Sequence, residues 1–129
     1  MPVLLDSTVL IDAARGRPAA DRIRGLLGQG EVPYICAINT EEIHRGLRLD
    51  EVGRVTTLLL AFRLAPLGLV EGALAGTWRR EYAARGITLD RADCLIAAAA
   101  LGVHATIATG NPKDFPMEGV TVEHWPVGR

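Results

Sequence analysis

Four acidic residues stand near the predicted ends of strands or helices, where their carboxylates could act together. Asp6 directly follows the apolar run at 3–5, and Asp114 comes shortly after an apolar stretch that ends at residue 109. Glu42 and Asp93 each lie in the first turns of a predicted helix. Clustered carboxylate oxygens suit Mg²⁺ or Mn²⁺ better than zinc. The chemistry of such a group would be hydrolysis by a metal-activated water.

The elements that must position these acids follow from the apolar pattern of the chain. Helical segments separate the short apolar runs, which predict strands at 3–5, 32–37, 62–67, 105–109 and 120–125. This alternation predicts an α/β fold, a three-layer α/β/α domain with a mainly parallel central sheet. Ligands of such folds bind at the carboxyl ends of the strands, near a topological switch point. We therefore expect Asp6 and Asp114 at that edge, whereas topology alone does not fix Asp93.

Glu42 can be separated from its neighbour Glu41 by helical geometry. The sequence predicts a helix over 39–49, and we project it at about 100° per residue with Ile38 at zero. The apolar side chains then fill an arc of roughly 180°, and Glu42 falls inside it at about 40°. Glu41 falls at about 300°, on the polar side. Glu42 therefore points toward the protein body, where a carboxylate needs a partner, unless it reaches solvent past Gly46.

The other three acids each have a purely structural explanation as well. Asp6 or Ser7 could cap the first helix. Asp93 stands three residues after Asp90, which is the spacing of a capping box. Asp114 could be an ordinary turn residue. Four carboxylates at one edge would raise one another's pKa and destabilise the fold, and a divalent cation would remove that conflict.

Length, charge and hydropathy limit the class of protein. The 129 residues fit one domain spanning 1–129. With 14 basic and 15 acidic residues, the net charge of −1 neither favours nor excludes a polyanionic partner. No apolar run approaches the ~20 residues that cross a bilayer, and the N-terminus lacks the basic segment of a signal peptide. We therefore expect a cytoplasmic protein without membrane contact.

The basic residues are nearly all arginine, and Lys113 is the only lysine. Arginine suits two-pronged phosphate contacts, although a GC-rich genome would produce the same bias. Arg45, Arg15 and Arg48 are candidates for an RNA-binding path toward the acids. The alternative is that these side chains are scattered, solvated charge.

These residues together carry a family pattern. The chain resembles PIN-domain ribonucleases, and among them the VapC-type toxins of bacterial toxin–antitoxin pairs. The matching segments resemble the family in their order and spacing, and the total length agrees as well. Together the segments extend over essentially the whole chain. The segments are Leu4-Leu5-Asp6-Ser7-Thr8-Val9-Leu10-Ile11-Asp12, Glu42-Ile43-His44-Arg45-Gly46, Asp93-Cys94-Leu95-Ile96-Ala97-Ala98-Ala99-Ala100 and Thr109-Gly110-Asn111-Pro112-Lys113-Asp114-Phe115.

The resemblance implies roles for individual residues. The catalytic and metal-binding quartet would be Asp6, Glu42, Asp93 and Asp114, with Asp6 and Asp93 as the most direct ligands. Ser7 would steady the site beside the first acid, and Thr109 and Asn111 would help to hold the fourth acid or a metal-bound water. Gly110 departs from the family, which often carries a basic or polar residue there.

The resemblance also implies a function. It predicts a Mg²⁺- or Mn²⁺-dependent endoribonuclease acting on tRNA, rRNA or mRNA, a toxin that inhibits translation or growth. Its expected partners are a cognate antitoxin and a second copy of the chain, and the apolar run at 58–60 is a candidate for either contact. The alternatives are a PIN nuclease of RNA processing and a non-catalytic PIN-like module that binds RNA or protein.

Two other α/β classes with acids at strand ends fit less well. A phosphoacceptor receiver domain needs adjacent acids after the first strand, where Asp6 stands alone. A phosphatase built on Asp-x-Asp needs a second acid where this chain has Thr8.

Overall fold

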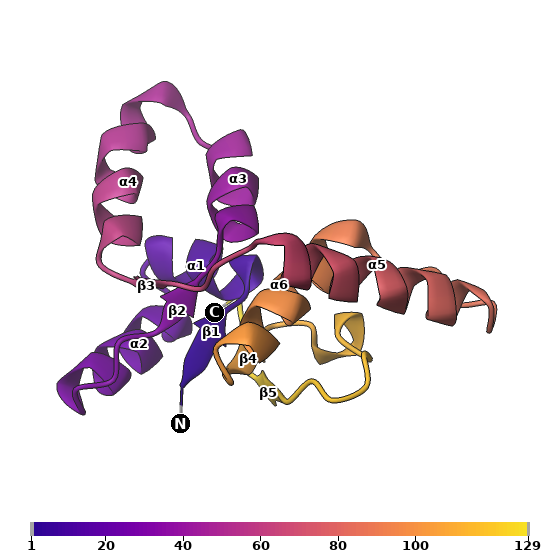
Figure 1. The fold of residues 1–129 in the computed structure, drawn as a ribbon. Helices are drawn as coiled ribbons and strands as arrows, with labels where there is room; N and C mark the ends of the chain where they lie inside the picture. The colour runs from indigo at the N-terminus through magenta and orange to yellow at the C-terminus, as the bar shows by residue number, and fades with distance from the viewer. Residues whose placement is uncertain (1, 129) are drawn as a thin grey trace.

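The structure, a computed structural model, describes residues 2–128 and contains strands and helices in mixed order (Figure 1). The strands are β1 (Val3–Leu5), β2 (Tyr34–Ile35), β3 (Arg63–Leu64), β4 (Thr106–Thr109) and β5 (Val122–His124). The α-helices are α1 (Ser7–Ala14), α2 (Pro18–Gly28), α3 (Ala37–Arg45), α4 (Val52–Leu60), α5 (Leu69–Ala83) and α6 (Arg91–Gly102). Two 3₁₀ turns, η1 (Leu49–Glu51) and η2 (Pro112–Asp114), complete the elements.

The five strands form one parallel sheet in the order β3-β2-β1-β4-β5. The chain moves outward from β1 through β2 to β3 and then returns to the other side of β1 with β4. The switch point of the topology therefore lies between β1 and β4, where Leu5 pairs with Ala108. A ligand site is expected beyond the carboxyl ends of these two strands.

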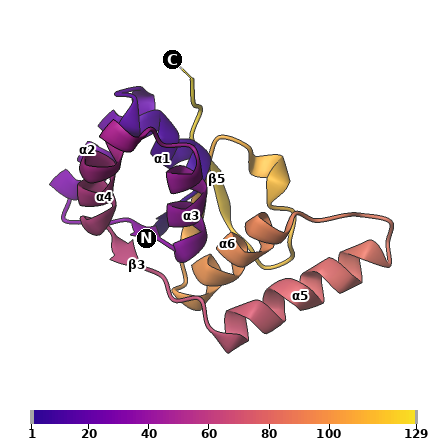
Figure 2. The same cartoon turned by 90° about the horizontal axis from the view of Figure 1, so that it is seen from above.

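Helices cover both faces of the sheet, because successive side chains of a strand point to opposite faces. Leu4 of β1 packs in a core cluster with α5 and α6, whereas Val3 and Leu5 pack in a second cluster with α1, α2, α3 and α4. Figure 2 shows these two sets of helices on opposite sides of the strands. The run of alanines from Ala97 to Ala100 in α6 is buried. The predicted three-layer α/β/α fold is confirmed.

Some element boundaries differ from the prediction. Of the predicted strand at 32–37, only Tyr34 and Ile35 pair as a strand. The helix predicted over 39–49 covers Ala37–Arg45, because the Asn39 side chain accepts the backbone N–H of Cys36 and so caps the helix from inside its first turn. The helix ends early, with Gly46 as its C-cap residue.

The two outer strands are also shorter than the apolar runs that predicted them. The run at 62–67 contributes only Arg63–Leu64, an exposed edge strand that ends before Pro66. The run at 120–125 contributes only Val122–His124. None of the helices in residues 2–128 is both long and apolar enough to cross a membrane.

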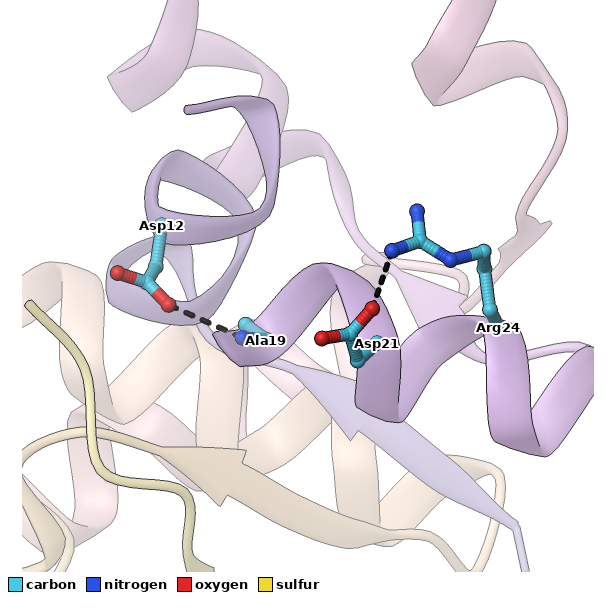
Figure 3. A network of polar contacts seen from close by, with 4 residues as sticks. All are labelled: Asp12, Ala19, Asp21 and Arg24. Atoms are coloured by element: carbon cyan, nitrogen blue, oxygen red, sulfur yellow. Dashed lines mark hydrogen bonds and ion pairs between the residues drawn. The ribbon is translucent and has the colours of Figure 1, made fainter. Parts of the chain in front are cut away.

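Asp12 joins the end of α1 to two other segments. It is only 3% exposed, and its Oδ2 accepts the backbone N–H of Ala19 at 3.1 Å in the first turn of α2 (Figure 3). Its Oδ1 accepts the N–H of Gly128 at 2.9 Å. Asp21 and Arg24, by contrast, form an exposed ion pair on the outside of α2 (Figure 3). Asp12 therefore has a structural role that holds α1, α2 and the C-terminal segment together.

Candidate active site

Asp6 lies at the switch point of the sheet. Its backbone N–H donates to the carbonyl of Ala108 at 2.9 Å and so continues the ladder between β1 and β4. Its Oδ2 accepts hydrogen bonds from the hydroxyls of Thr109, at 2.8 Å, and Thr8, at 2.9 Å. Asp6 occupies the N-cap position of α1, yet its side chain makes no capping hydrogen bond. Capping therefore does not explain this carboxylate, which is 5% exposed.

Glu42 faces the same region from α3. Ser7 Oγ donates to Glu42 Oε1 at 2.7 Å and accepts from Asn39 Nδ2 at 3.1 Å. The hydroxyl of Ser7 is therefore used on Glu42 and not as a helix cap. Glu42 is half-buried and Glu41 is exposed, as the helical projection predicted.

Asp93 stands in the first turn of α6, and its carboxylate does not cap the helix. Asp90 is the N-cap, and its Oδ2 accepts the backbone N–H of Asp93 at 3.1 Å. Burial, followed by the charges of Asp90, Asp114, Asp6 and Glu42, raises the pKa of Asp93 to about 7. The charges of the other three acids of the predicted quartet thus act on Asp93, so the four residues share one electrostatic neighbourhood.

Asp114 belongs to the 3₁₀ turn that follows β4. Its backbone N–H donates to the carbonyl of Asn111 at 3.0 Å, and the N–H of Asn111 donates to Thr109 Oγ1 at 3.0 Å. Asp114 is exposed and does have the geometry of a turn residue. Thr109 thus donates to the first acid and accepts from the loop that carries the fourth.

Three residues that support the site were missed by the sequence reasoning. Thr8 donates to Asp6 and accepts the N–H of Gly110 at 3.1 Å. Asn39 is fully buried and orients Ser7. Tyr82 of α5 donates to the carbonyl of Pro116 and accepts the N–H of Glu118, both at 3.0 Å, and so holds the loop after Asp114. No signal in the sequence indicated these roles, because Asn39 was predicted to begin the helix and the structure places it at the N3 position.

The chemistry of the donor set fits a hard divalent cation. All four acids offer oxygen, and burial together with the negative charges of the other acids raises the pKa of Asp93. Within residues 2–128, however, no three His, Cys, Asp or Glu side chains lie close enough together to hold a metal ion as they stand. The carboxylates are neighbours whose charge a cation would neutralise.

The three candidate arginines differ in their surroundings. Arg15, the C-cap residue of α1, lines a cavity that Glu42 also lines. Arg48 lies within 3.6 Å of Asp50 and 3.7 Å of Glu51. Arg45 is exposed on α3 and is not among the residues that line the cavity beside Glu42.

Comparisons with known proteins identify the family. The PIN-domain profile matches residues 3–116. Ribonuclease VapC10 of Mycobacterium tuberculosis is 35% identical over 116 residues, which cover 89% of this chain and 86% of that protein. Ribonuclease VapC19 of the same organism is 30% identical over 115 residues, which cover 88% of this chain and 92% of that protein. The chain belongs to the PIN-domain family, and the resemblance to this family is confirmed.

Solved structures share the fold over nearly the whole chain. VapBC2 from Rickettsia felis, bound to a DNA fragment from its promoter, aligns with a TM-score of 0.82 at 20% identity and covers 97% of this chain and 99% of that one. FitAB bound to the IR36 DNA fragment aligns with a TM-score of 0.76 at 26% identity and covers 95% of this chain and 94% of that one.

Proposed function

We propose that this protein is a Mg²⁺- or Mn²⁺-dependent endoribonuclease that hydrolyses RNA phosphodiester bonds, with Asp6, Glu42, Asp93 and Asp114 as its catalytic and metal-binding residues. The observation that carries the proposal is the hydrogen-bonded set beyond β1 and β4 of a PIN domain, where Thr109 donates to Asp6 and Ser7 donates to Glu42. The charges of the other three acids also contribute to the raised pKa of Asp93. The curated relatives named ribonucleases support the reaction class.

The side chains around the acids have the task of orienting them. Two hydroxyls donate to Oδ2 of Asp6, which leaves Oδ1 for a ligand. Ser7 fixes Oε1 of Glu42 and leaves the lone pairs of Oε2 for a water or a ligand. A bound divalent cation supplies a water of lowered pKa and neutralises charge on the phosphate oxygens. Asp6 and Asp93 would hold it most directly, and another carboxylate of the quartet could accept the proton of the attacking water.

The biological role that fits this activity is that of a toxin restrained by an antitoxin protein in the cytoplasm. Both curated relatives carry the VapC name, and a toxin–antitoxin complex from Klebsiella pneumoniae shares the fold with a TM-score of 0.75. Leu60 and Leu64 are 80% and 66% exposed beside an apolar cavity between α3, α4 and β3. This surface is a candidate for contact with the antitoxin or with a second copy of the chain.

The test is cleavage of cellular RNA by protein freed of any antitoxin. We expect cleavage with Mn²⁺, none with EDTA, and none from Asp6→Asn or Asp93→Asn. Two threonines of β4 give a matched pair: Thr109→Val removes a donor to Asp6 and is expected to lower activity by about 10- to 100-fold. Thr106→Val makes the same change at the far end of the strand, away from the acids, and is expected to keep activity.

Two results would redirect the proposal. Absence of cleavage together with absence of Mn²⁺ binding in calorimetry would favour a PIN-like module that binds RNA or protein. Cleavage without growth arrest on expression, or arrest that no neighbouring small gene relieves, would favour a nuclease of RNA processing.

A further inference from the structure

A cavity of about 160 Å³ lies directly beside Glu42. The end of α1, the inner side of α3 and the start of α4 form its walls. It is several times larger than the space that a single water requires. Because Glu42 is one of the four acids, a group bound in this cavity would lie next to the reacting centre.

Two arginines line this cavity without an ion-pair partner. Arg15 comes from the end of α1 and Arg54 from α4. Neither has a carboxylate within 4.0 Å among residues 2–128, whereas Arg24 is paired with Asp21. The two guanidinium groups are therefore available to an anion that enters from solvent.

The two acidic side chains of the cavity each accept a hydrogen bond from within the protein. Glu42 accepts the hydrogen bond of Ser7. Glu51 accepts the backbone N–H of Arg48 at 2.9 Å and lies 3.7 Å from its side chain. The lining thus carries two positive and two negative charges, and of these four, within residues 2–128, Arg15 and Arg54 are the two whose side chains have no hydrogen-bond or ion-pair partner.

The rest of the lining is apolar, with Ile11, Leu47 and Val55 among its members. Apolar walls keep water away from one side of a bound anion and strengthen its attraction to a guanidinium group. They also suit the sugar or base that accompanies a phosphate. Arginine binds phosphate oxygens with two parallel hydrogen bonds.

We propose that Arg15 and Arg54 bind a backbone phosphate of single-stranded RNA, one next to the phosphodiester that is cleaved. This inference rests on the proposed nuclease function and adds the subsite that positions its substrate. Arg15 and Arg54 touch the substrate strand, and they set how it lies across the acids.

The test is steady-state cleavage of a fluorescein-labelled single-stranded RNA in Mn²⁺, at several salt concentrations. Arg15→Gln and Arg54→Gln are each expected to raise KM by about fivefold with a smaller change in kcat, because the lost contact is made in the bound state as well as in the transition state. The slope of log kcat/KM against log salt should fall by about 0.7 for each lost phosphate contact. Arg24→Gln is the matched control and should change neither quantity.

The outcomes separate this inference from the function on which it rests. If the wild-type chain cleaves no RNA, the nuclease proposal and the subsite both fail. If the wild-type chain cleaves RNA and both variants keep its KM and salt slope, the subsite alone is wrong. If the variants keep KM but resist inhibition by the cognate antitoxin, the cavity binds an acidic group of that protein and not RNA.

Discussion

At the scale of single residues, Asp93 best reports how the acids influence one another. Its own backbone N–H is held by Asp90, and its carboxyl is half-buried among four other negative charges. Burial and these charges raise its pKa from the ordinary 3.8 to about 7. Between these two pKa values, the folded protein therefore keeps a proton on Asp93 that the unfolded chain has lost.

We predict that the metal-free protein loses stability as pH rises from about 4 to about 7, and that Asp93→Asn removes much of this loss. The unfolded chain ionises near the ordinary pKa, whereas the folded chain must ionise against burial and repulsion. The stabilising effect of the bound proton is thus complete below the unfolded pKa and is lost as pH rises through about 7.

Urea unfolding in EDTA at several pH values measures this effect. Asp21→Asn, an exposed acid on α2, should leave the pH dependence unchanged. Equal pH dependence in wild type and Asp93→Asn would show that Asp93 is not the group that titrates.

The sequence predicted some of these residues and could not predict others. Asp6 follows a strand and Glu42 falls on the inner side of a helix, so local patterns were enough to predict where these two side chains lie. The partners of these acids depend on tertiary contacts: Thr109 is 103 residues from Asp6, and Ser7 is 35 residues from Glu42. Without a structure or a known family, no periodicity connects such pairs.

At the scale of elements, α2 depends on a side chain from outside it. Its N-cap residue, Arg17, makes no side-chain capping bond. Asp12 of α1 performs this task instead, because it accepts the N–H of Ala19 (Figure 3). It also accepts the N–H of Gly128. The cap of one helix therefore links three segments.

We predict that Asp12→Ala lowers the free energy of unfolding by about 1–3 kcal/mol, since two backbone donors lose their buried acceptor. Asp21→Ala, in the first turn of the same helix, removes only an exposed ion pair and should cost about 0–1 kcal/mol. Chemical denaturation of the two variants measures the difference. Equal losses would mean that Asp12 contributes no more than a surface charge.

Element types were more predictable than element ends. Apolar runs identified all five strands, but a strand ends where its ladder of hydrogen bonds ends, and this depends on its neighbours. The helix that carries Glu42 begins two residues earlier than predicted because Asn39 caps it from inside. The sequence alone suggested that Asn39 opens the helix.

At the scale of the whole molecule, the C-terminal segment returns to the edge where β1 and β4 end. Trp125 is buried in the core cluster of α1 to α4, and its backbone N–H donates to the carbonyl of Thr109 at 2.8 Å. Val127 then lies over Gly110, so close that a Cβ at position 110 would stand 2.8 Å from its Cγ2. This contact gives a physical reason for glycine where the family often carries a larger residue.

We predict that Gly110→Ala destabilises the protein by about 1 kcal/mol, at the lower end of the cost of overpacking because Val127 is 42% exposed and its side chain can turn aside. In a Val127→Ala background the same change should cost close to nothing, so a double-mutant cycle should yield most of that energy as coupling. Gly25→Ala is the control, because its Cβ would meet nothing within 4 Å, and a helical alanine there should be neutral or stabilising. A cost that persists without the Val127 side chain would show that Val127 does not cause it, and Thr8 Oγ1, 3.5 Å from the new Cβ, would be only in ordinary contact. That result would mean that contact with the C-terminal segment is not the reason for glycine at position 110.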